Sequence, residues 1–207
     1  MLKVGLTGGV ACGKTTVATM FEKRGAHVAL ADVIAHNLFE PGSEVYEKVV
    51  EHFGPEVLNE DKTISRPKLA DIAFPERIKE LNAIVHPVVI RLQDDWMRGI
   101  EQRESRAIAI VEAALMVEAG AHKRFDKLIV VTCGFDQKID RFAERARMSP
   151  DEACADVRRR MEAQLPESEK IKLADYVIDN SGSVGHLDEQ VDKIWRELCK
   201  IEAAKKP

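Results

Sequence analysis

A glycine-rich segment near the start of the chain has the residue types and the spacing to bind phosphate. Residues 8–15 read Gly-Gly-Val-Ala-Cys-Gly-Lys-Thr, which fits the P-loop pattern G-x-x-x-x-G-K-[ST]. Glycines let such a loop curl so that its backbone N–H groups point at phosphate oxygens, and the following helix adds its positive end. Lys14 is expected to reach the β- and γ-phosphates, and the Thr15 hydroxyl to bind Mg²⁺. The expected nucleotide-binding residues are Gly9, Val10, Ala11, Cys12, Gly13, Lys14, Thr15 and Thr16.

Two carboxylates follow apolar runs further along the chain. Asp32 comes directly after residues 27–31, and Glu112 directly after residues 107–111. Ligands of parallel α/β sheets bind beyond the carboxyl ends of the strands, so both acids are candidates for the phosphate site. Asp32 would take or orient the proton of an attacking hydroxyl, or it would cap the helix that begins at Val33. Glu112 fits the Walker B pattern, in which a carboxylate supports Mg²⁺, although strands that end in an acid are common.

Histidine and arginine side chains complete the set of candidates. His36 lies one turn beyond Asp32 and would face either the phosphate acceptor or solvent. Arg141 and Arg145 are four residues apart and share a face of a predicted helix. Residues 136–148 and 150–163 predict a helical pair that closes as a lid over ATP, with a solvated face as the alternative. We expect Arg141 to contact phosphate.

Five short apolar runs predict buried strands, and helical spacing fills most of the stretches between them. The first run leads into the P-loop and a helix over residues 14–24, and the second run follows that helix. This strand–loop–helix–strand unit predicts a parallel sheet and argues against a chance glycine-rich turn. The predicted strands are residues 2–7, 27–31, 107–111, 127–132 and 174–178.

The region between residues 32 and 103 has the pattern of helices without a buried strand. Such an insert is a common substrate-binding subdomain, although helices that only cover the sheet would give the same pattern. Pro87 should kink or divide the last of these helices, because proline removes an intrahelical hydrogen bond. The helices predicted in the insert are residues 33–39, 43–53, 67–74 and 75–103, and further helices are expected over residues 115–119 and 184–203.

Composition places the chain among ordinary globular proteins. Of its 207 residues 45% are hydrophobic and 32% are charged, and the formal net charge is -4. This balance gives no basic field for nucleic acid, and no apolar run is long enough to span a bilayer. The chain begins directly with a predicted strand and its four cysteines are scattered, which predicts a cytoplasmic protein with reduced thiols. No pattern identifies a protein interface, so we expect a monomer or a weak homo-oligomer.

The ordered set of motifs resembles one family, the dephospho-coenzyme A kinases. The resemblance spans nearly the whole chain. A P-loop alone would not separate kinases from one another, whereas the ordered set is specific. The residues that carry the resemblance are 4–9 with Gly13 and Lys14; Ala31 and Asp32 with Ile34, Ala35 and His36; Arg66 with Leu69 and Phe74; Leu81 and Asn82 with His86 and Pro87; Leu115 and Glu118; Gln137, Arg141 and Arg145; Arg160, Met161 and Gln164; and 174–178 with Asn180 and Gly182.

The resemblance implies a fold and a division of the chain. The fold is α/β, a P-loop NTPase core with a five-stranded parallel sheet flanked by helices. The nucleotide-binding core would comprise residues 1–31, 104–135 and 170–207. A helical insert over residues 32–103 would bind dephospho-CoA, and residues 136–169 would form a helical lid.

The resemblance also implies an activity. Members of the family use ATP and Mg²⁺ to phosphorylate the 3′-hydroxyl of the ribose of dephospho-CoA, which gives CoA and ADP in the last step of CoA biosynthesis. In this chain Asp32 would act as the base, and Lys14 and Arg141 would be the other catalytic residues. The remaining site residues would be Thr15 and Glu112 at the metal, Asn180 and Gly182 beside the nucleotide, and Asp32, His36, Arg66 and His86 at the acceptor.

The chain departs from the family pattern at four positions. Ala11 and Cys12 stand where the P-loop usually has Gly and Ser, Glu112 stands where the acid is usually Asp, and Ala114 stands where Pro is usual. Since only glycine takes positive φ freely, Ala11 must lie at negative φ or strain the loop. The thiol of Cys12, beside inward amides and a helix N-terminus, is expected to have a lowered pKa unless it is a small filler.

Three other functions are compatible with a P-loop. A different small-molecule or nucleoside monophosphate kinase would share the core and the lid, but Asp32, Arg66 and His86 argue against it. A GTP-dependent switch would need a guanine-binding signature after the fourth strand, and the sequence has none there. A binding module without activity is disfavoured because Lys14, Thr15 and Asp32 are intact.

Overall fold

The computed structural model describes the backbone of residues 1–73 and 76–205, and within these ranges all side chains except those of residues 35–37. The chain divides into two compact units, one of Met1–Leu30 with Gly99–Pro207 and one of Ala31–Arg98. Each unit has a hydrophobic core of its own. No helix in the described ranges has both the length and the apolar character needed to cross a membrane.

The elements of the first unit alternate between strands and helices. The strands are β1 (Leu2–Gly8), β2 (His27–Leu30), β3 (Ile108–Glu112), β4 (Lys127–Thr132) and β5 (Tyr176–Asp179). The helices are α1 (Lys14–Glu22), the short 3-10 helix η2 (Ala121–Arg124), α6 (Phe135–Ala146), α7 (Pro150–Glu162), α8 (Glu167–Leu173) and α9 (Val184–Ala204). The second unit contains α2 (Ala31–Asn37), α3 (Glu44–Phe53), the 3-10 helix η1 (Pro55–Val57), α4 (Arg66–Ala73) and most of α5 (Ile78–Arg103).

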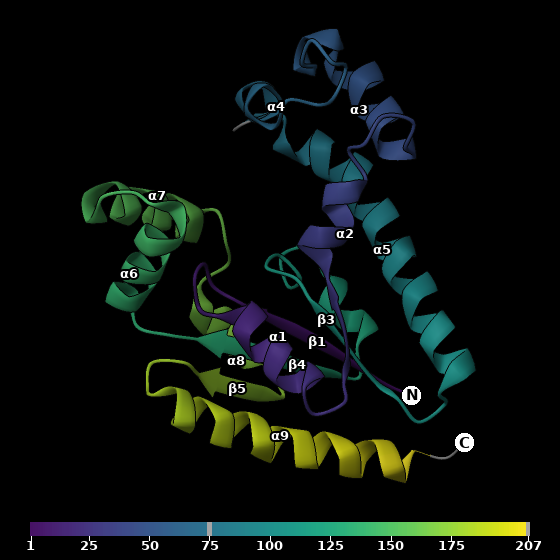
Figure 1. Cartoon of the computed structure of the whole chain (residues 1–207), viewed down its shortest axis with the longest axis vertical. Helices are drawn as coiled ribbons and strands as arrows, with labels where there is room; N and C mark the ends of the chain where they lie inside the picture. Colours follow the sequence, from purple (N-terminus) through teal and green to yellow (C-terminus); the bar gives the residue numbers. More distant parts are fainter. Residues whose placement is uncertain (74–75, 206–207) are drawn as a thin grey trace. The chain divides into compact units, whose positions relative to one another are not determined.

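A five-stranded parallel sheet forms the centre of the first unit (Figure 1). Its strand order is β2-β3-β1-β4-β5, so the strand that leads into the P-loop is the central one. The apolar residues of β1 are buried on both faces, which explains why this strand has a nearly continuous apolar sequence rather than an alternating one. The α/β fold with a five-stranded parallel sheet, expected from the sequence, is confirmed.

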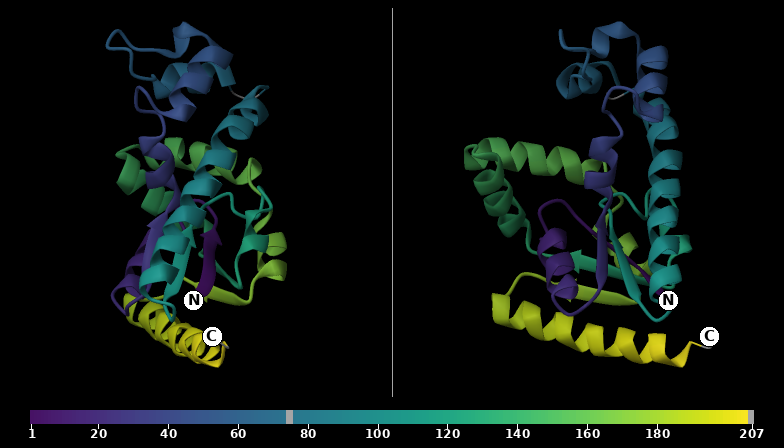
Figure 2. Two further views of the ribbon diagram at one scale, coloured as in Figure 1. Left: turned by 90° about the vertical axis from the view of Figure 1, so that its right-hand side faces the viewer. Right: turned by 45° about the vertical axis from the view of Figure 1, so that its right-hand side comes forward.

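Helices α1 and α9 cover one face of this sheet (Figure 2). Apolar side chains recur at helical spacing on α9, where Leu187, Val191 and Leu198 are buried against the strands. The hydroxyl of Ser183 caps the helix by accepting a hydrogen bond from the backbone N–H of His186. This packing holds the helix that follows the P-loop in a fixed position on the sheet.

The connection between β3 and β4 does not contain the helix expected over residues 115–119. These residues form turns, followed by η2. The segment is followed by Gly120, which has φ 67°, a left-handed conformation that cannot continue a helix. Met116 and Val117 are buried instead, and a Cβ on Gly5 would lie 2.6 Å from the sulfur of Met116. Met116 and Val117 are therefore core residues, whereas Leu115 is exposed.

Helices α6 and α7 form a hairpin after β4 (Figure 2). Ser149 and Glu152 form a capping box at the start of α7, since the Ser149 hydroxyl accepts from the Glu152 N–H and the Glu152 carboxylate accepts from the Ser149 N–H. The core of the hairpin is built around Phe142 and Val157, and it includes Val10 of the P-loop. The hairpin therefore packs directly on the phosphate-binding loop.

Helix α8 is missing from the sequence prediction, which has no helix between residue 163 and the strand expected at residue 174. Its start does carry a signal, because a proline precedes it and Glu167 and Glu169 lie in its first turn. The apolar periodicity is hidden because the fully buried side chain of this short helix is a lysine, Lys170. A pattern based on apolar residues cannot detect such a helix.

The second unit is helical in its described part, apart from one isolated bridge between Leu58 and Ile64. Its core gathers apolar side chains of α3, α4 and α5, among them Val49, Phe53 and Leu69. The predicted helices start and end within a few residues of the observed ones, except that Phe74 and Pro75, the predicted end of one helix and start of the next, lie outside the described residues.

Helix α5 continues through Pro87, so of the two expected effects, a kink or a division, the division does not occur. Pro87 is exposed and takes away one intrahelical hydrogen bond. The residues on either side of it, Val85 and Val88, are buried in the core of the second unit. Burial of these two side chains stabilises the helix across the missing bond.

Candidate active site

The P-loop connects the carboxyl end of β1 to the first turn of α1. Gly8 has φ 152°, and a Cβ there would lie 2.2 Å from the carbonyl oxygen of Val131. Gly13 has φ 85°, and a Cβ there would lie 2.3 Å from the side-chain amide of Asn180. These two glycines are required both for the backbone conformation and for the close approach of neighbouring segments.

Ala11 adopts φ 54°, so the expectation of a negative φ is wrong and the alternative, a strained loop, is what occurs. An L-residue in this left-handed region costs about 1–2 kcal/mol. The methyl group of Ala11 packs against the core of the α6–α7 hairpin, next to Val10 and Phe142. Contact with the hairpin offsets part of this strain. A glycine at position 11 would carry no such strain.

Lys14 and Thr15 lie where the loop meets α1. The Lys14 amino group donates to the carbonyl oxygen of Gly9 at 2.9 Å, across the mouth of the loop. The Thr15 hydroxyl is 3.4 Å from a carboxylate oxygen of Glu112. Glu112 is buried at the carboxyl end of β3, where it pairs in register with Leu6 of β1. The parallel sheet therefore places the predicted Walker B acid beside the P-loop.

The Thr15 hydroxyl and the Glu112 carboxylate fit Mg²⁺ by their chemistry. Mg²⁺ prefers hard oxygen ligands and commonly takes one or two from the protein, with phosphate oxygens and waters as the others. Among the described residues no group of three His, Cys, Asp or Glu side chains is arranged to hold a metal by itself. A metal held jointly by the protein and a nucleotide is consistent with this small set of ligands.

Arg141 of α6 reaches the P-loop from the hairpin. Its Nη2 atom donates to the carbonyl oxygen of Asn180 at 2.9 Å. Its Nη1 atom is buried and has no hydrogen-bond partner within the described part of the chain. This atom lies 3.9 Å from the position of a Cβ on Gly13, so the unsatisfied donor is directed at the phosphate-binding loop. A phosphate oxygen would satisfy it.

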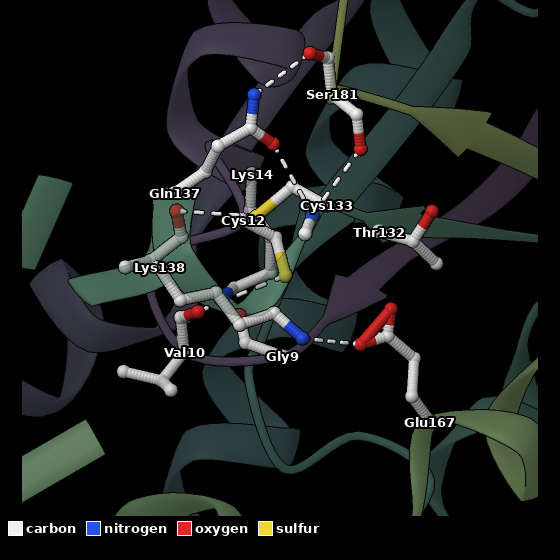
Figure 3. A network of polar contacts seen from close by, with 12 residues as sticks. Gly9, Val10, Cys12, Lys14, Thr132, Cys133, Gln137, Lys138, Glu167 and Ser181 are labelled. Atoms are coloured by element: carbon white, nitrogen blue, oxygen red, sulfur yellow. Dashed lines mark hydrogen bonds and ion pairs between the residues drawn. The ribbon is translucent and has the colours of Figure 1, made fainter. Parts of the chain in front are cut away.

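Two cysteine thiols lie side by side beneath the loop (Figure 3). Cys12 is fully buried and its thiol donates to the carbonyl oxygen of Val10 at 3.7 Å. Cys133, which follows β4 and is also buried, donates its thiol to the carbonyl oxygen of Ala11 at 4.0 Å. Interaction with the neighbouring Cys133 thiol, together with burial, raises the pKa of Cys12. Interaction with Cys12, followed by the charges of Arg141 and Lys138, lowers the pKa of Cys133 to about 7. The expectation of a lowered pKa at Cys12 is therefore wrong, because the thiolate is favoured at its neighbour.

Two buried ion pairs lie under the P-loop, and sequence reasoning missed both. Lys138 donates to Glu167 at 2.5 Å next to Gly9 (Figure 3), and Lys170 lies 2.8 Å from Glu118. Each pair joins residues that are 29 or more positions apart in the chain. Charged residues on helices normally indicate solvent exposure, so the sequence carried little signal for either pair.

The other predicted nucleotide-binding residues differ in their surroundings. Thr16 is exposed on α1, and Gly182 is exposed in the turn after β5. Asn180 is buried, and its side-chain amide donates to the carbonyl oxygen of Cys12 at 2.8 Å. The Asn180 side chain therefore contacts the P-loop backbone directly.

The predicted acceptor residues belong to the second unit. Asp32 is exposed in the first turn of α2, two residues after the end of β2. Arg66 is the first residue of α4, and its guanidinium lies 5.7 Å from the centre of the Phe39 ring. His86 is half-buried in α5, and this burial lowers its pKa. The side chain of His36 lies outside the described residues.

Comparison with known proteins identifies the family. The sequence model described as Dephospho-CoA kinase matches residues 2–186. The chain belongs to the dephospho-CoA kinase family. A dephospho-CoA kinase from Aquifex aeolicus (strain VF5) is 41% identical over 202 residues, which cover 97% of this chain and 99% of the relative.

Solved structures agree with this assignment. A crystal structure of a protein from Thermus thermophilus matches with a TM-score of 0.77 at 30% identity. The match covers 95% of this chain and 97% of the Thermus thermophilus chain. A dephospho-CoA kinase from Campylobacter jejuni matches with a TM-score of 0.68 at 26% identity. The match covers 96% of this chain and 97% of the Campylobacter jejuni chain. As a member of the family, the chain is an ATP-dependent kinase of dephospho-CoA in coenzyme A biosynthesis.

Proposed function

We propose that the chain transfers the γ-phosphoryl group of ATP directly to the 3′-hydroxyl of the ribose of dephospho-CoA, which gives CoA and ADP. The observation that carries this mechanism is the convergence of Lys14, Thr15, Glu112 and Arg141 on one loop at the carboxyl end of β1. Direct transfer needs positioned reactants and stabilised charge rather than a covalent intermediate on the protein. These side chains supply both requirements.

The P-loop would bind the β- and γ-phosphates. Residues 9–16 carry the backbone N–H groups, and Lys14 would exchange its hydrogen bond to Gly9 for phosphate oxygens. Thr15 and Glu112 would hold Mg²⁺, which when bound neutralises charge on the phosphates. Arg141 would direct its unsatisfied Nη1 at the oxygens of the transferred group.

The remaining roles follow the division of the chain. Asp32 would accept the proton of the 3′-hydroxyl as the new bond forms, and His36, Arg66 and His86 would contact dephospho-CoA. The insert of residues 32–103 would bind the acceptor, residues 136–169 would close as a lid, and the rest would form the nucleotide-binding core. Asn180 and Gly182 would border the nucleotide.

We further propose that the protein acts in the cytoplasm as a monomer or a weak homo-oligomer, without a nucleic-acid or membrane partner. The formal net charge of -4 supports the absence of a nucleic-acid partner. Light scattering after size-exclusion chromatography over a range of protein concentrations tests the oligomeric state. A stable oligomer at low micromolar concentration would contradict the proposal.

A coupled ADP-release assay tests the substrate. Purified protein with ATP and Mg²⁺ is compared on dephospho-CoA, on nucleoside monophosphates and on shikimate. We expect turnover with dephospho-CoA at least about 100-fold faster than with the others, because a site that hydrogen-bonds one acceptor leaves buried polar groups unpaired with a different one. Faster turnover with another acceptor would overturn the substrate assignment, and NMR of the phosphorylated product would test the 3′ position.

A further inference from the structure

Asn180 lies at a junction of three segments of the first unit. It follows directly after β5, and its side chain is 7% exposed. Its backbone N–H donates to the carbonyl oxygen of Thr132 at 2.8 Å, which ties the residue to the carboxyl end of β4. The residue is therefore held by the sheet itself, independently of any ligand.

The other polar groups of Asn180 contact two parts of the candidate site. Its side-chain Nδ2 donates to the carbonyl oxygen of Cys12 at 2.8 Å, and its backbone carbonyl accepts from Arg141 Nη2 at 2.9 Å. The amide also packs so closely on Gly13 that a Cβ there would lie 2.3 Å from Nδ2. One residue thus holds both the peptide between Cys12 and Gly13 and the guanidinium of Arg141.

We propose that Asn180 is a positioning residue, which orients the Arg141 guanidinium relative to the P-loop so that one face of the arginine remains available to phosphate. The proposal rests on the proposed roles of the P-loop and Arg141, and it assigns Asn180 no contact with the transferred group. Arg141 Nη2 is satisfied by Asn180, while the buried Nη1 has no partner in the described residues. Asn180 thus engages one of the two terminal guanidinium nitrogens of Arg141 and leaves the other for phosphate.

The chemistry of the asparagine side chain is specific to this position. A carbonyl oxygen needs a donor, and the Asn180 amide provides one in a buried setting. Aspartate has the same shape but at neutral pH only accepts hydrogen bonds, so its oxygen would oppose the Cys12 carbonyl. The loop would shift away from it, and Arg141 would be drawn toward the new carboxylate. A displacement of about 1 Å in such a site costs roughly 100-fold in rate.

The test compares Asn180→Asp with a matched control, Gln190→Ala. Gln190 anchors the same loop through Asp179: it accepts a hydrogen bond from the Asp179 N–H at 3.0 Å and donates one to the Asp179 carbonyl oxygen at 2.9 Å. Within the described part of the chain, its hydrogen bonds reach neither the P-loop nor Arg141. We expect Asn180→Asp to lower kcat by roughly 10- to 100-fold with a smaller change in KM for dephospho-CoA. We expect Gln190→Ala to stay within about 3-fold of the wild type. Equal losses in both variants would show that Asn180 only packs the loop.

A double-mutant cycle with Arg141→Ala distinguishes positioning from packing. If Asn180 acts through Arg141, the combined loss in kcat is smaller than the product of the separate losses, whereas independent effects multiply to within about 2-fold. Multiplicative losses, or an Asn180→Asp variant with wild-type kcat, would overturn the proposal. Asn180→Ala and thermal unfolding of every variant exclude loss of folding as the cause.

Failure of the proposed function gives a different result. If the wild type does not turn over dephospho-CoA, the acceptor assignment fails, and the same cycle is then measured on the affinity for ATP by isothermal calorimetry. Positioning predicts that the two substitutions are also non-additive in ATP affinity, because both act on the same phosphate contact. Additive effects there would overturn the role of Asn180 by itself.

Discussion

At the scale of single residues, the P-loop shows how neighbouring segments change the chemistry of a sequence motif. Cys12 has the surroundings that favour a thiolate when only the loop and its helix are considered. In the folded chain it is fully buried and lies beside Cys133, which is close to Arg141 and Lys138. The acidity therefore moves to a residue that is 121 positions away in the sequence.

Alkylation of Cys133 should titrate with a midpoint near its pKa of about 7, which the neighbouring Cys12 thiol and the nearby cations produce. Since the thiolate is the nucleophile, the rate should fall as the pH drops below 7 and level off above it. Mass spectrometry of iodoacetamide-treated protein between pH 5.5 and 9.5 measures this rate at each cysteine. Cys12→Ala removes the neighbouring thiol and should move the midpoint at Cys133 upward by at least one pH unit, while exposed Cys199 serves as an internal comparison. Faster alkylation at Cys12 would contradict this assignment.

Replacement of Arg141 by alanine should lower kcat by roughly 1,000-fold, because an arginine that stabilises the transferred charge is worth 10³ or more in phosphoryl transfer. Arg145 on the same helix is the matched control. Its guanidinium lies 5.4 Å from the centre of the Phe142 ring, and its side chain is exposed. The Arg145→Ala substitution is therefore expected to lower kcat by less than about 10-fold. Steady-state kinetics with ATP and dephospho-CoA measure both, and similar losses would refute a special role for Arg141.

At the scale of elements, buried ion pairs connect the helical hairpin to the core. Lys138 near the start of α6 and Glu167 at the start of α8 meet beside Gly9 of the P-loop. The hairpin core also includes Val10. The ends of the α6–α7 hairpin and the phosphate-binding loop thus form one packed assembly, which makes the position of Arg141 sensitive to substitutions at the base of the hairpin.

Lys138→Met should lower the free energy of unfolding by about 2–3 kcal/mol, because it leaves the partly buried Glu167 carboxylate without its partner. Lys172→Met is the matched control, since the ion pair of Lys172 with Glu169 is exposed on α8. Its loss should change the free energy of unfolding by less than about 0.5 kcal/mol. Urea unfolding followed by circular dichroism measures both. Adding Glu167→Gln to Lys138→Met should recover part of the loss, and no recovery would show that the lysine acts through packing alone.

At the scale of the whole molecule, the candidate residues come from both compact units. Lys14, Thr15, Glu112, Arg141 and Asn180 belong to the unit built on the sheet, and the proposed base, Asp32, belongs to the helical unit. The proposed mechanism therefore draws on residues of both units, whereas the proposed contacts to ATP draw on residues of the first.

Asp32→Asn should keep the affinity for ATP within about 3-fold and lower kcat by roughly 100-fold or more, because general-base catalysis contributes about 10²–10⁴. Asp71→Asn, a change of another exposed aspartate in the helical unit, should leave both quantities near those of the wild type. Calorimetric titration with ATP and the ADP-release assay measure the two effects. An Asp32→Asn variant with near-normal kcat would show that another group accepts the proton.

Much of the fold could be predicted because its signals are local. The P-loop, the five strands and the capping box at Ser149 depend on residues that are close in sequence. The failures occurred where distant residues decide the outcome. Burial of Val85 and Val88 keeps α5 continuous through Pro87, and burial of Met116 makes the segment after β3 part of the core rather than a helix.

The sequence by itself determined the phosphate-binding loop, the parallel α/β class and the family, because each rests on residue types at set spacings along the chain. Only the tertiary structure decided which groups share that loop. Glu112, Cys133, Arg141 and Asn180 reach it from segments about 100 or more residues away, brought together at the carboxyl ends of adjacent strands. Their contacts depend on strand order and helix packing, which spacing along a chain does not encode.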